Sequence, residues 1–253
     1  MGTYLITGAT GGIGGATAEL LREHGHDLIL AGSSPERLQR LAGQFAATPY
    51  GKTQSFNLAA SGRPVTPGRH ISTITLDLSE PRRMEAALAV VDLPARLDGL
   101  IHSAGVTDLG RVADQDADHW IDQLMINLVG AAELTRLLLP SLRAAAGQVV
   151  FVNSGAGLRA NPGWSAYAAS KHGLKALADS LRAEEPGIRV TSVFPGRTAT
   201  EMQRKVRAQE GGEYRSADYI EPSTVARAIL GAIETPADGI VTDLSIRTRG
   251  NGA

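Results

Sequence analysis

The chain has 253 residues, 43% of them hydrophobic, and its 25 lysines and arginines are balanced by 26 acidic residues. This length suffices for one large domain or two small ones with a buried core, and the near-neutral charge argues against nucleic acid or an anionic membrane as a partner. The sequence contains no cysteine, which excludes disulfides and a cysteine nucleophile, and it contains no HExxH pair, so we expect no metal site.

Short apolar segments alternate with longer segments of helical period along most of the chain. The predicted strands are Thr3–Thr7, Asp27–Ala31, Ile71–Leu76, Leu97–His102, Gln148–Asn153, Ile188–Phe194 and Ile240–Ile246. The predicted helices are Ile13–His24, Pro35–Phe45, Pro81–Val91, Ala117–Leu142, Ala166–Glu184, Glu201–Ala208 and Pro222–Glu234. Continuously apolar strands are typical of a parallel sheet that is covered on both faces. The repeated strand–helix units predict an α/β fold, a single domain over residues 1–253 with a Rossmann-like, doubly wound parallel sheet of about seven strands.

Residues 43–70 interrupt this alternation. The stretch is rich in glycine, proline, serine and threonine and lacks a sustained period, although connections in α/β units usually take 2–6 residues. We interpret it as an irregular insertion on the surface of the domain. A functional flap and an oligomer contact remain as alternatives.

We also expect no membrane segment. The N-terminus enters the first predicted strand without a basic leader or an apolar signal core, and no later apolar run approaches the ~18 residues of a membrane span. The sequence therefore predicts a soluble, cytoplasmic protein with no membrane partner.

A glycine-rich turn, Thr7-Gly8-Ala9-Thr10-Gly11-Gly12-Ile13-Gly14, follows the first predicted strand and opens the first predicted helix. A turn in this position can hold a pyrophosphate, because the N–H groups of the first helical turn have no partner within the helix. Gly8 permits the tight turn, Gly12 lets the backbone approach the phosphates, and Gly14 allows close packing of helix and strand. The spacing is TGxxxGxG rather than GxGxxG, and a tight turn without a ligand is the alternative.

Several further motifs occur in the order and approximate spacing of the single-domain short-chain dehydrogenases/reductases, which this chain resembles. They are Asp77, His102-Ser103-Ala104-Gly105, Asn127, Ser154, Tyr167-x-x-x-Lys171 and Pro195-Gly196. The resemblance covers nearly the whole chain outside residues 43–70. It implies a nicotinamide-dependent oxidoreductase that interconverts a ketone or aldehyde with an alcohol on a small organic substrate. It also implies a homodimer or homotetramer, for which the leucine cluster Leu134, Leu137, Leu138 and Leu139 offers apolar surface.

The predicted catalytic residues are Tyr167, Lys171, Ser154 and Asn127. Tyr167 and Lys171 are four residues apart, so they share one face of a helix, and a nearby ammonium group favours the phenolate form of a tyrosine. Tyr167 would exchange a proton with the substrate oxygen while Ser154 holds that oxygen. The resemblance gives Lys171 a contact with the nicotinamide ribose and gives Asn127 a relay water. An amide bonded to backbone is the alternative for Asn127.

The resemblance also implies a set of cofactor contacts. Asp77 and Leu78 would lie at the adenine, with a strand-end or helix-capping aspartate as the alternative. Where the family usually has Asn-Asn-Ala-Gly, this chain has His102 and Ser103 and so lacks both amides. The predicted cofactor-binding residues in these motifs are Gly8, Thr10, Gly12, Ile13, Gly14, Asp77, Leu78, Ser103, Ala104, Gly105, Tyr167, Lys171, Pro195, Gly196, Thr198 and Thr200, and either threonine suits the nicotinamide end.

The segment after the second predicted strand favours NADP(H) over NAD(H). An NAD site usually carries a carboxylate there, which binds the ribose 2′-hydroxyl and repels a 2′-phosphate. This chain has no acid at those positions, and Ser33, Ser34 and Arg37 are suitable phosphate partners. Against this, Gly11 occupies a position where many NADP-preferring relatives have a basic side chain.

Two other functions remain open. A catalytically silent dinucleotide-binding or scaffold protein would not need Ser154, Tyr167 and Lys171. A nucleotide-sugar epimerase or dehydratase is disfavoured by the glycine spacing and by the short sequence after Gly196. Substrate identity is not encoded in any motif, although Trp164 in the loop after Ser154 is a candidate for closing an apolar pocket.

Overall fold

The computed structural model describes residues 1–47 and 70–249. Seven strands form one parallel sheet in the order β3-β2-β1-β4-β5-β6-β7. The strands are β1 (Thr3–Thr7), β2 (Asp27–Gly32), β3 (Ile71–Thr75), β4 (Gly99–His102), β5 (Gln148–Val152), β6 (Arg189–Pro195) and β7 (Asp243–Ile246). The strand order reverses between β1 and β4, and open α/β sheets bind ligands at the carboxyl edge beside such a point. The predicted doubly wound sheet is therefore confirmed.

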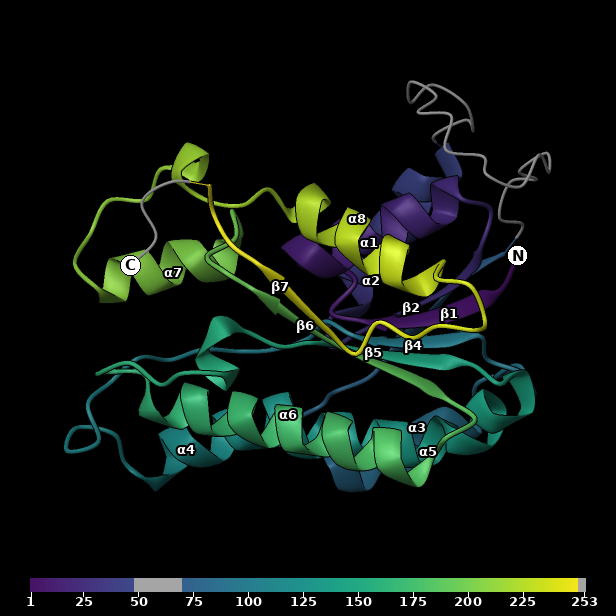
Figure 1. Ribbon diagram of the computed structural model, residues 1–253, viewed down its shortest axis with the longest axis horizontal. Coiled ribbons are helices and arrows are strands. Elements are labelled where there is room, and N and C mark those ends of the chain that lie inside the picture. Colours follow the sequence, from purple (N-terminus) through teal and green to yellow (C-terminus); the bar gives the residue numbers. More distant parts are fainter. Residues whose placement is uncertain (48–69, 250–253) are drawn as a thin grey trace.

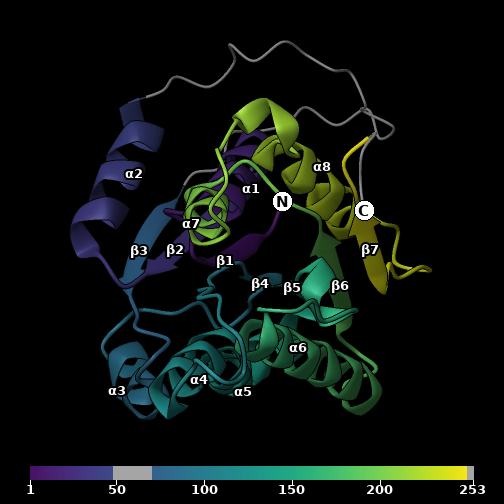
Figure 2. The same cartoon turned by 90° about the vertical axis from the view of Figure 1, so that its left-hand side faces the viewer.

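Helices cover both faces of this sheet (Figures 1 and 2). One face carries α1 (Gly12–Glu23), α2 (Pro35–Ala47) and α8 (Pro222–Ile233). The other face carries α3 (Met84–Ala89), α4 (Ala117–Leu124), α5 (Gly130–Ala145) and α6 (Ser165–Glu184). Helix α7 (Glu201–Gln209) lies beyond the carboxyl ends of the strands, at the left of Figure 1.

Two hydrophobic cores lie between the sheet and its two helical layers, one on each face of the sheet. Successive side chains of a strand point to opposite faces, so Leu100 of β4 enters the core beneath α5 and α6, whereas Ile101 enters the core beneath α1 and α8. Both cores fix the strands from the two sides. The carboxyl edge is consequently a rigid platform for the loops that follow each strand.

The predicted helix Ala117–Leu142 is a continuous helical run, but its hydrogen bonding changes midway. Residues Met125–Val129 form a π-helical turn between α4 and α5. Such turns are rare and are often found at functional sites, and this one contains Asn127. The predicted helix at Pro81 also differs, because it begins with the 3₁₀ turn Pro81–Arg83 and only then continues as α3.

The leucine cluster of α5 faces inward. Leu134 and Leu138 are buried, and Leu137 and Leu139 pack against the same core. Leu134 and Leu138 therefore offer no free apolar surface, whereas Leu137 and Leu139 are only partly covered. Among the described residues, the exposed large apolar side chains of this helical run are Ile121 and Val129.

By length and composition alone, the run Ala117–Ala145 could cross a membrane, contrary to the expectation that no apolar run approaches that length. A core helix of a soluble protein meets the same criterion, and this run packs one face against the sheet. The predicted insertion begins as regular structure, since α2 continues to Ala47. Residues 48–69, which make up most of it, lie outside the described part of the chain.

Candidate active site

The glycine-rich turn connects β1 to α1 at the carboxyl edge of the sheet. Gly8 has a φ of +65°, a left-handed conformation that favours glycine. A Cβ atom at Gly14 would lie 2.3 Å from the carbonyl oxygen of Gly8, so only glycine lets the helix start this close to the turn. A Cβ atom at Gly12 would lie 2.5 Å from the methyl group of Thr200, just before α7. The structural roles expected for Gly8 and Gly14 agree with this geometry.

Thr7 joins this turn to the segment that follows β4. Its hydroxyl oxygen accepts hydrogen bonds from the N–H groups of Ser103 and Ala104, both at 3.2 Å. The backbone of Ala104 also lies against Gly8, where an added Cβ would be 2.7 Å from the Ala104 nitrogen. Ser103 and Ala104, both predicted to bind the cofactor, therefore lie directly beside the glycine-rich turn, at the point where the strand order reverses.

Tyr167, Lys171 and Ser154 converge at the same edge. Tyr167 and Lys171 are buried on α6, and the Lys171 ammonium nitrogen lies 5.8 Å from the centre of the Tyr167 ring. Lys171 donates a hydrogen bond to the carbonyl oxygen of Val152 at 3.2 Å, and burial lowers its pKa to about 8. Burial raises the pKa of the Tyr167 phenol, while the hydrogen bond with Ser154 lowers it. The ammonium group of Lys171 does not offset the burial of Tyr167, so the protein alone holds this residue as a neutral phenol.

Asn153 was not singled out from the sequence, yet it fixes Ser154. Its side-chain oxygen accepts the Ser154 N–H at 2.8 Å, and its nitrogen donates to the carbonyl oxygen of Lys171 at 3.0 Å. Ser154 Oγ in turn accepts the N–H of Ala156 at 3.1 Å. A buried amide at the end of a strand, directly before the candidate serine, was the available signal. Asn153 thereby ties the end of β5 to α6.

Asn127 holds the loop after β4 with its side-chain amide. Its oxygen accepts the Val106 N–H at 2.8 Å, and its nitrogen donates to the Val106 carbonyl at 2.9 Å and to Ser170 Oγ at 3.0 Å. The side chain is therefore bonded to backbone, as the alternative interpretation held. Asn127 still lies beside the site, because a Cβ at Gly105 would be 3.1 Å from its oxygen and 3.6 Å from the Lys171 ammonium nitrogen.

His102 replaces the first amide of the family motif with a neutral imidazole. Its Nε2 lies 2.9 Å from Thr135 Oγ1, and the Thr135 hydroxyl donates to the Ala131 carbonyl, so Nε2 carries the proton. The ring stacks on Phe151 with 5.0 Å between ring centres, and Nδ1 has no hydrogen-bond partner among the described residues. Burial, assisted by the Lys171 charge, lowers the pKa of His102 to about 3.

In the turn after β6, the hydroxyl groups of both candidate threonines are hydrogen-bonded to nearby backbone groups. Thr200 accepts the Gln203 N–H at 3.2 Å and so caps α7, while the Thr198 hydroxyl donates to the Gly196 carbonyl at 3.0 Å. At the end of β3, Asp77 accepts hydrogen bonds from the N–H and hydroxyl of Ser79, which is the strand-end role considered above.

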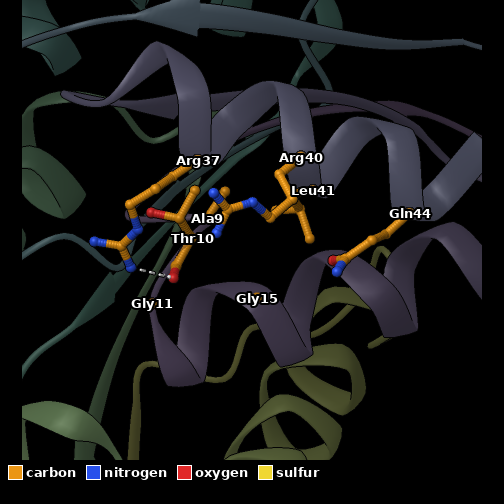
Figure 3. Close-up of a pocket in the computed structure, with 8 residues that line it drawn as sticks. All are labelled: Ala9, Thr10, Gly11, Gly15, Arg37, Arg40, Leu41 and Gln44. Atoms are coloured by element: carbon orange, nitrogen blue, oxygen red, sulfur yellow. Dashed lines mark hydrogen bonds between the residues drawn. The ribbon is translucent and has the colours of Figure 1, made fainter.

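The carboxyl end of β2 leads into a shallow hollow between α1 and α2 (Figure 3). Ser34 caps α2, since its Oγ accepts the Arg37 N–H at 3.3 Å and donates to Glu36 at 2.9 Å. Arg37 donates to the Thr10 carbonyl at 2.9 Å. The hollow has a volume of about 240 Å³ and is lined by Ala9, Thr10, Gly11, Gly15, Arg37, Arg40, Leu41 and Gln44. Arg40 was missed in the sequence, although its spacing of three residues from Arg37 places both on one side of α2.

Comparison with known proteins identifies the family of this chain. A family model described as short chain dehydrogenase matches residues 3–211. Over 238 residues the chain is 32% identical to dehydrogenase/reductase SDR family member 7B of Danio rerio, covering 90% of this chain and 73% of that protein. Over 219 residues it is 33% identical to oxidoreductase UcpA of Escherichia coli K12, covering 83% and 74%.

Solved structures share the whole fold. An E. coli oxidoreductase, yciK, is 26% identical with a TM-score of 0.80, covering 96% of this chain and 93% of that one. An alcohol dehydrogenase of the archaeon Thermococcus sibiricus, complexed with 5-hydroxy-NADP, is 22% identical with a TM-score of 0.81, covering 100% of both chains. The chain has the Rossmann-like fold of these proteins. It belongs to the short-chain dehydrogenase/reductase family, a family of oxidoreductases.

Proposed function

We propose that this chain is a nicotinamide-dependent oxidoreductase that interconverts a ketone or aldehyde with an alcohol, using Tyr167 as its general acid and base. The observation that carries the proposal is the convergence of Tyr167, Lys171 and Ser154 beside the glycine-rich turn. The nicotinamide cofactor would supply or accept the hydride. The residues of the chain would bind the substrate oxygen and move its proton.

The proton chemistry follows from the environments of the side chains. A buried, neutral Tyr167 is the form that donates a proton to a carbonyl oxygen during reduction. Ser154 Oγ accepts a backbone N–H and its hydroxyl is hydrogen-bonded with Tyr167, so a substrate oxygen placed between the two hydroxyls would take over the Ser154 proton, which would stabilise the charge that develops there. Lys171 keeps a positive charge at neutral pH, since its pKa remains near 8, and this charge favours the phenolate left after transfer.

We further propose that the cofactor is NADP(H) rather than NAD(H). Arg37 is oriented by the Thr10 carbonyl, Arg40 lies beside it, and the residues lining the hollow include no carboxylate. A phosphate ester fits such a site, because guanidinium groups bind phosphate oxygens with charge-assisted hydrogen bonds. Short-chain dehydrogenases of Shigella flexneri and E. coli with related folds are complexed with NADP and NADPH, respectively, which supports the proposal.

The test is a screen of aldehydes and ketones with NADPH and with NADH, together with a titration of cofactor binding. We expect turnover of some carbonyl substrate and a higher kcat/KM with NADPH. Cofactor binding without turnover across a broad panel would instead favour a silent dinucleotide-binding or scaffold protein. A change of sugar configuration without net cofactor consumption would favour an epimerase.

We also propose a cytoplasmic homodimer or homotetramer. Ile121 and Val129, exposed on α4 and at the π turn, are apolar groups that a subunit contact would cover. Light scattering at micromolar concentration tests the assembly, and a particle with the mass of a single chain contradicts it.

A further inference from the structure

Trp164 lies directly before α6 and contacts Tyr167 edge to face. The ring centres are 5.8 Å apart and the ring planes are inclined by 63°, an arrangement that aromatic pairs prefer. The backbone of Trp164 is fixed as well, since its N–H donates to the Asn161 carbonyl and its own carbonyl accepts the Ala168 N–H at 2.7 Å. Trp164 also packs on the small apolar cluster that contains Tyr167 and Ala156.

The indole ring is contacted in turn by Arg197, from the turn after β6. The guanidinium carbon lies 5.9 Å from the centre of the Trp164 ring, within reach of a cation–π interaction. Glu210, directly after α7, accepts two hydrogen bonds from Arg197, at 2.7 and 2.6 Å. Glu210 accepts a third from Arg207 at 2.6 Å. Arg197 is therefore held in a fixed plane by a two-point ionic contact.

These contacts form a continuous path from the end of α7 to the phenol of Tyr167. The two helices it joins lie on opposite sides of the carboxyl edge of the sheet (Figure 1). On the same phenol ring, the Lys171 ammonium nitrogen lies 5.8 Å from the centre. A tyrosine side chain turns about two bonds, and a small displacement of its hydroxyl from the substrate oxygen strongly reduces the rate of proton transfer.

We propose that Trp164 is a positioning residue for the reaction, and that Arg197 and Glu210 hold it where it sets the orientation of the Tyr167 ring. This inference depends on the proposed function for its catalytic consequence. The competing interpretation is that Trp164 is only a wall of the substrate cleft. The two differ in whether kcat or KM responds to its removal.

The kinetic test replaces Trp164 in two steps. Trp164→Ala is expected to lower kcat about 10- to 100-fold while the KM for the carbonyl substrate and the cofactor dissociation constant stay unchanged. Trp164→Phe keeps an aromatic edge and is expected to recover most of kcat. Trp120→Phe, on α4 outside this group of residues, is the matched control. A raised KM with normal kcat in Trp164→Ala would overturn the positioning role.

A second test needs no turnover. The chain has two tryptophans, so Trp120→Phe leaves Trp164 as the sole tryptophan, whose fluorescence can be excited selectively over that of tyrosine. Adding Glu210→Gln removes one charge of the ionic contact, and quenching of Trp164 by acrylamide is expected to increase because Arg197 no longer holds the indole. Unchanged quenching would overturn the role of Arg197 and Glu210.

A third measurement reads the phenol itself, from the ultraviolet difference between each protein and its Tyr167→Phe counterpart. Burial raises the pKa of Tyr167, so Trp164→Ala, which admits water, is expected to lower that pKa towards its ordinary value of 10. An unchanged titration would contradict the inference. If the parent protein turns over no carbonyl compound, the proposed function fails. The quenching result still decides whether Arg197 and Glu210 hold Trp164, and the titration still decides whether Trp164 covers the Tyr167 phenol.

Discussion

Around Tyr167 the side chains that would carry the chemistry are buried and held by hydrogen bonds, whereas at the end of β2 the charged side chains lie exposed. Tyr167, Lys171 and Asn127 are 6%, 4% and 2% exposed. Arg37 and Arg40 are exposed on α2, and Arg37 is oriented by one backbone carbonyl. The comparison suggests that the nicotinamide end depends on fixed geometry, while the adenosine end depends on charge that solvent partly screens.

Of the changes considered, removal of the Tyr167 hydroxyl should cause the largest loss of activity. Tyr167→Phe is expected to lower kcat by about 10²- to 10⁴-fold, the contribution of a positioned acid or base, with little change in cofactor affinity. Steady-state kinetics and a cofactor titration measure the two quantities. Tyr4→Phe, a buried tyrosine in β1 near the amino edge of the sheet, is the control. Near-normal turnover in Tyr167→Phe would refute the assigned role.

His102 should make the buried end sensitive to acid. The unfolded histidine binds a proton below its ordinary pKa of 6.5, but the folded one does so only near pH 3. Its contribution to stability is therefore complete above pH 6.5 and is lost as the pH falls towards 3, by up to about 5 kcal/mol. Denaturant unfolding should show that His102→Asn lacks this loss. The exposed His70→Asn should keep it, and equal pH profiles for the parent and His102→Asn would contradict the prediction.

Lys171 should produce a slope of the same sign at alkaline pH. Its folded pKa of about 8 lies below the ordinary 10.5, so the unfolded chain binds more protons between these values and stability rises with pH there. The full difference corresponds to about 3 kcal/mol. Comparison of the parent with Lys171→Met from pH 8 to 10 isolates this contribution. The test stops there because Tyr167, whose pKa is raised above 10, opposes it at higher pH.

Substitutions at the exposed end of the site, after β2, should have smaller effects on activity and should change the preference between NADPH and NADH. Arg37→Ala and Arg40→Ala are each expected to lower kcat/KM for NADPH about 10-fold, as for one charge-assisted hydrogen bond, and to leave NADH nearly unaffected. Ser33→Asp should shift preference towards NADH by repulsion of a 2′-phosphate. Arg136→Ala, on the outer side of α5, is the control. Equal losses with both cofactors would show that the arginines serve structure rather than phosphate binding.

The predictable part of the molecule is the part encoded in local pattern. Apolar runs and helical period located the strands and most helix limits, because burial on both faces of a sheet leaves a continuous signal. The π turn was missed, since a change from one hydrogen-bond register to another leaves the apolar pattern almost intact. The burial of Leu134 and Leu138 was missed for a similar reason, because a helix that is apolar over a wide arc does not reveal which part is covered.

The residues of the candidate site also fall into two groups, those that local spacing predicts and those whose role depends on the tertiary structure. Tyr167 and Lys171 are neighbours on one helix, so their spacing alone brings them together. Asn153 bonds to Ser154 and to Lys171, and Arg40 lines a hollow together with the glycine-rich turn, so the role of each depends on a segment distant in the sequence. The direction of the Tyr167 pKa also depends on tertiary burial: the sequence suggested an ammonium that lowers it, whereas the folded chain raises it.

The π turn at Met125–Val129 changes the direction in which the side chains of α4 point relative to those of α5. Each residue advances an α-helix by about 100°, so deletion of one residue from this turn would restore regular winding and rotate α4 against α5 by about that angle. After that rotation, either the leucines of α5 could remain in the core or the amide of Asn127 could remain bonded to its loop, but both sets of contacts could not be kept together. The one extra residue in the π turn thus allows a single helical run to place the leucines of α5 in the hydrophobic core and the amide of Asn127 against the polar loop after β4.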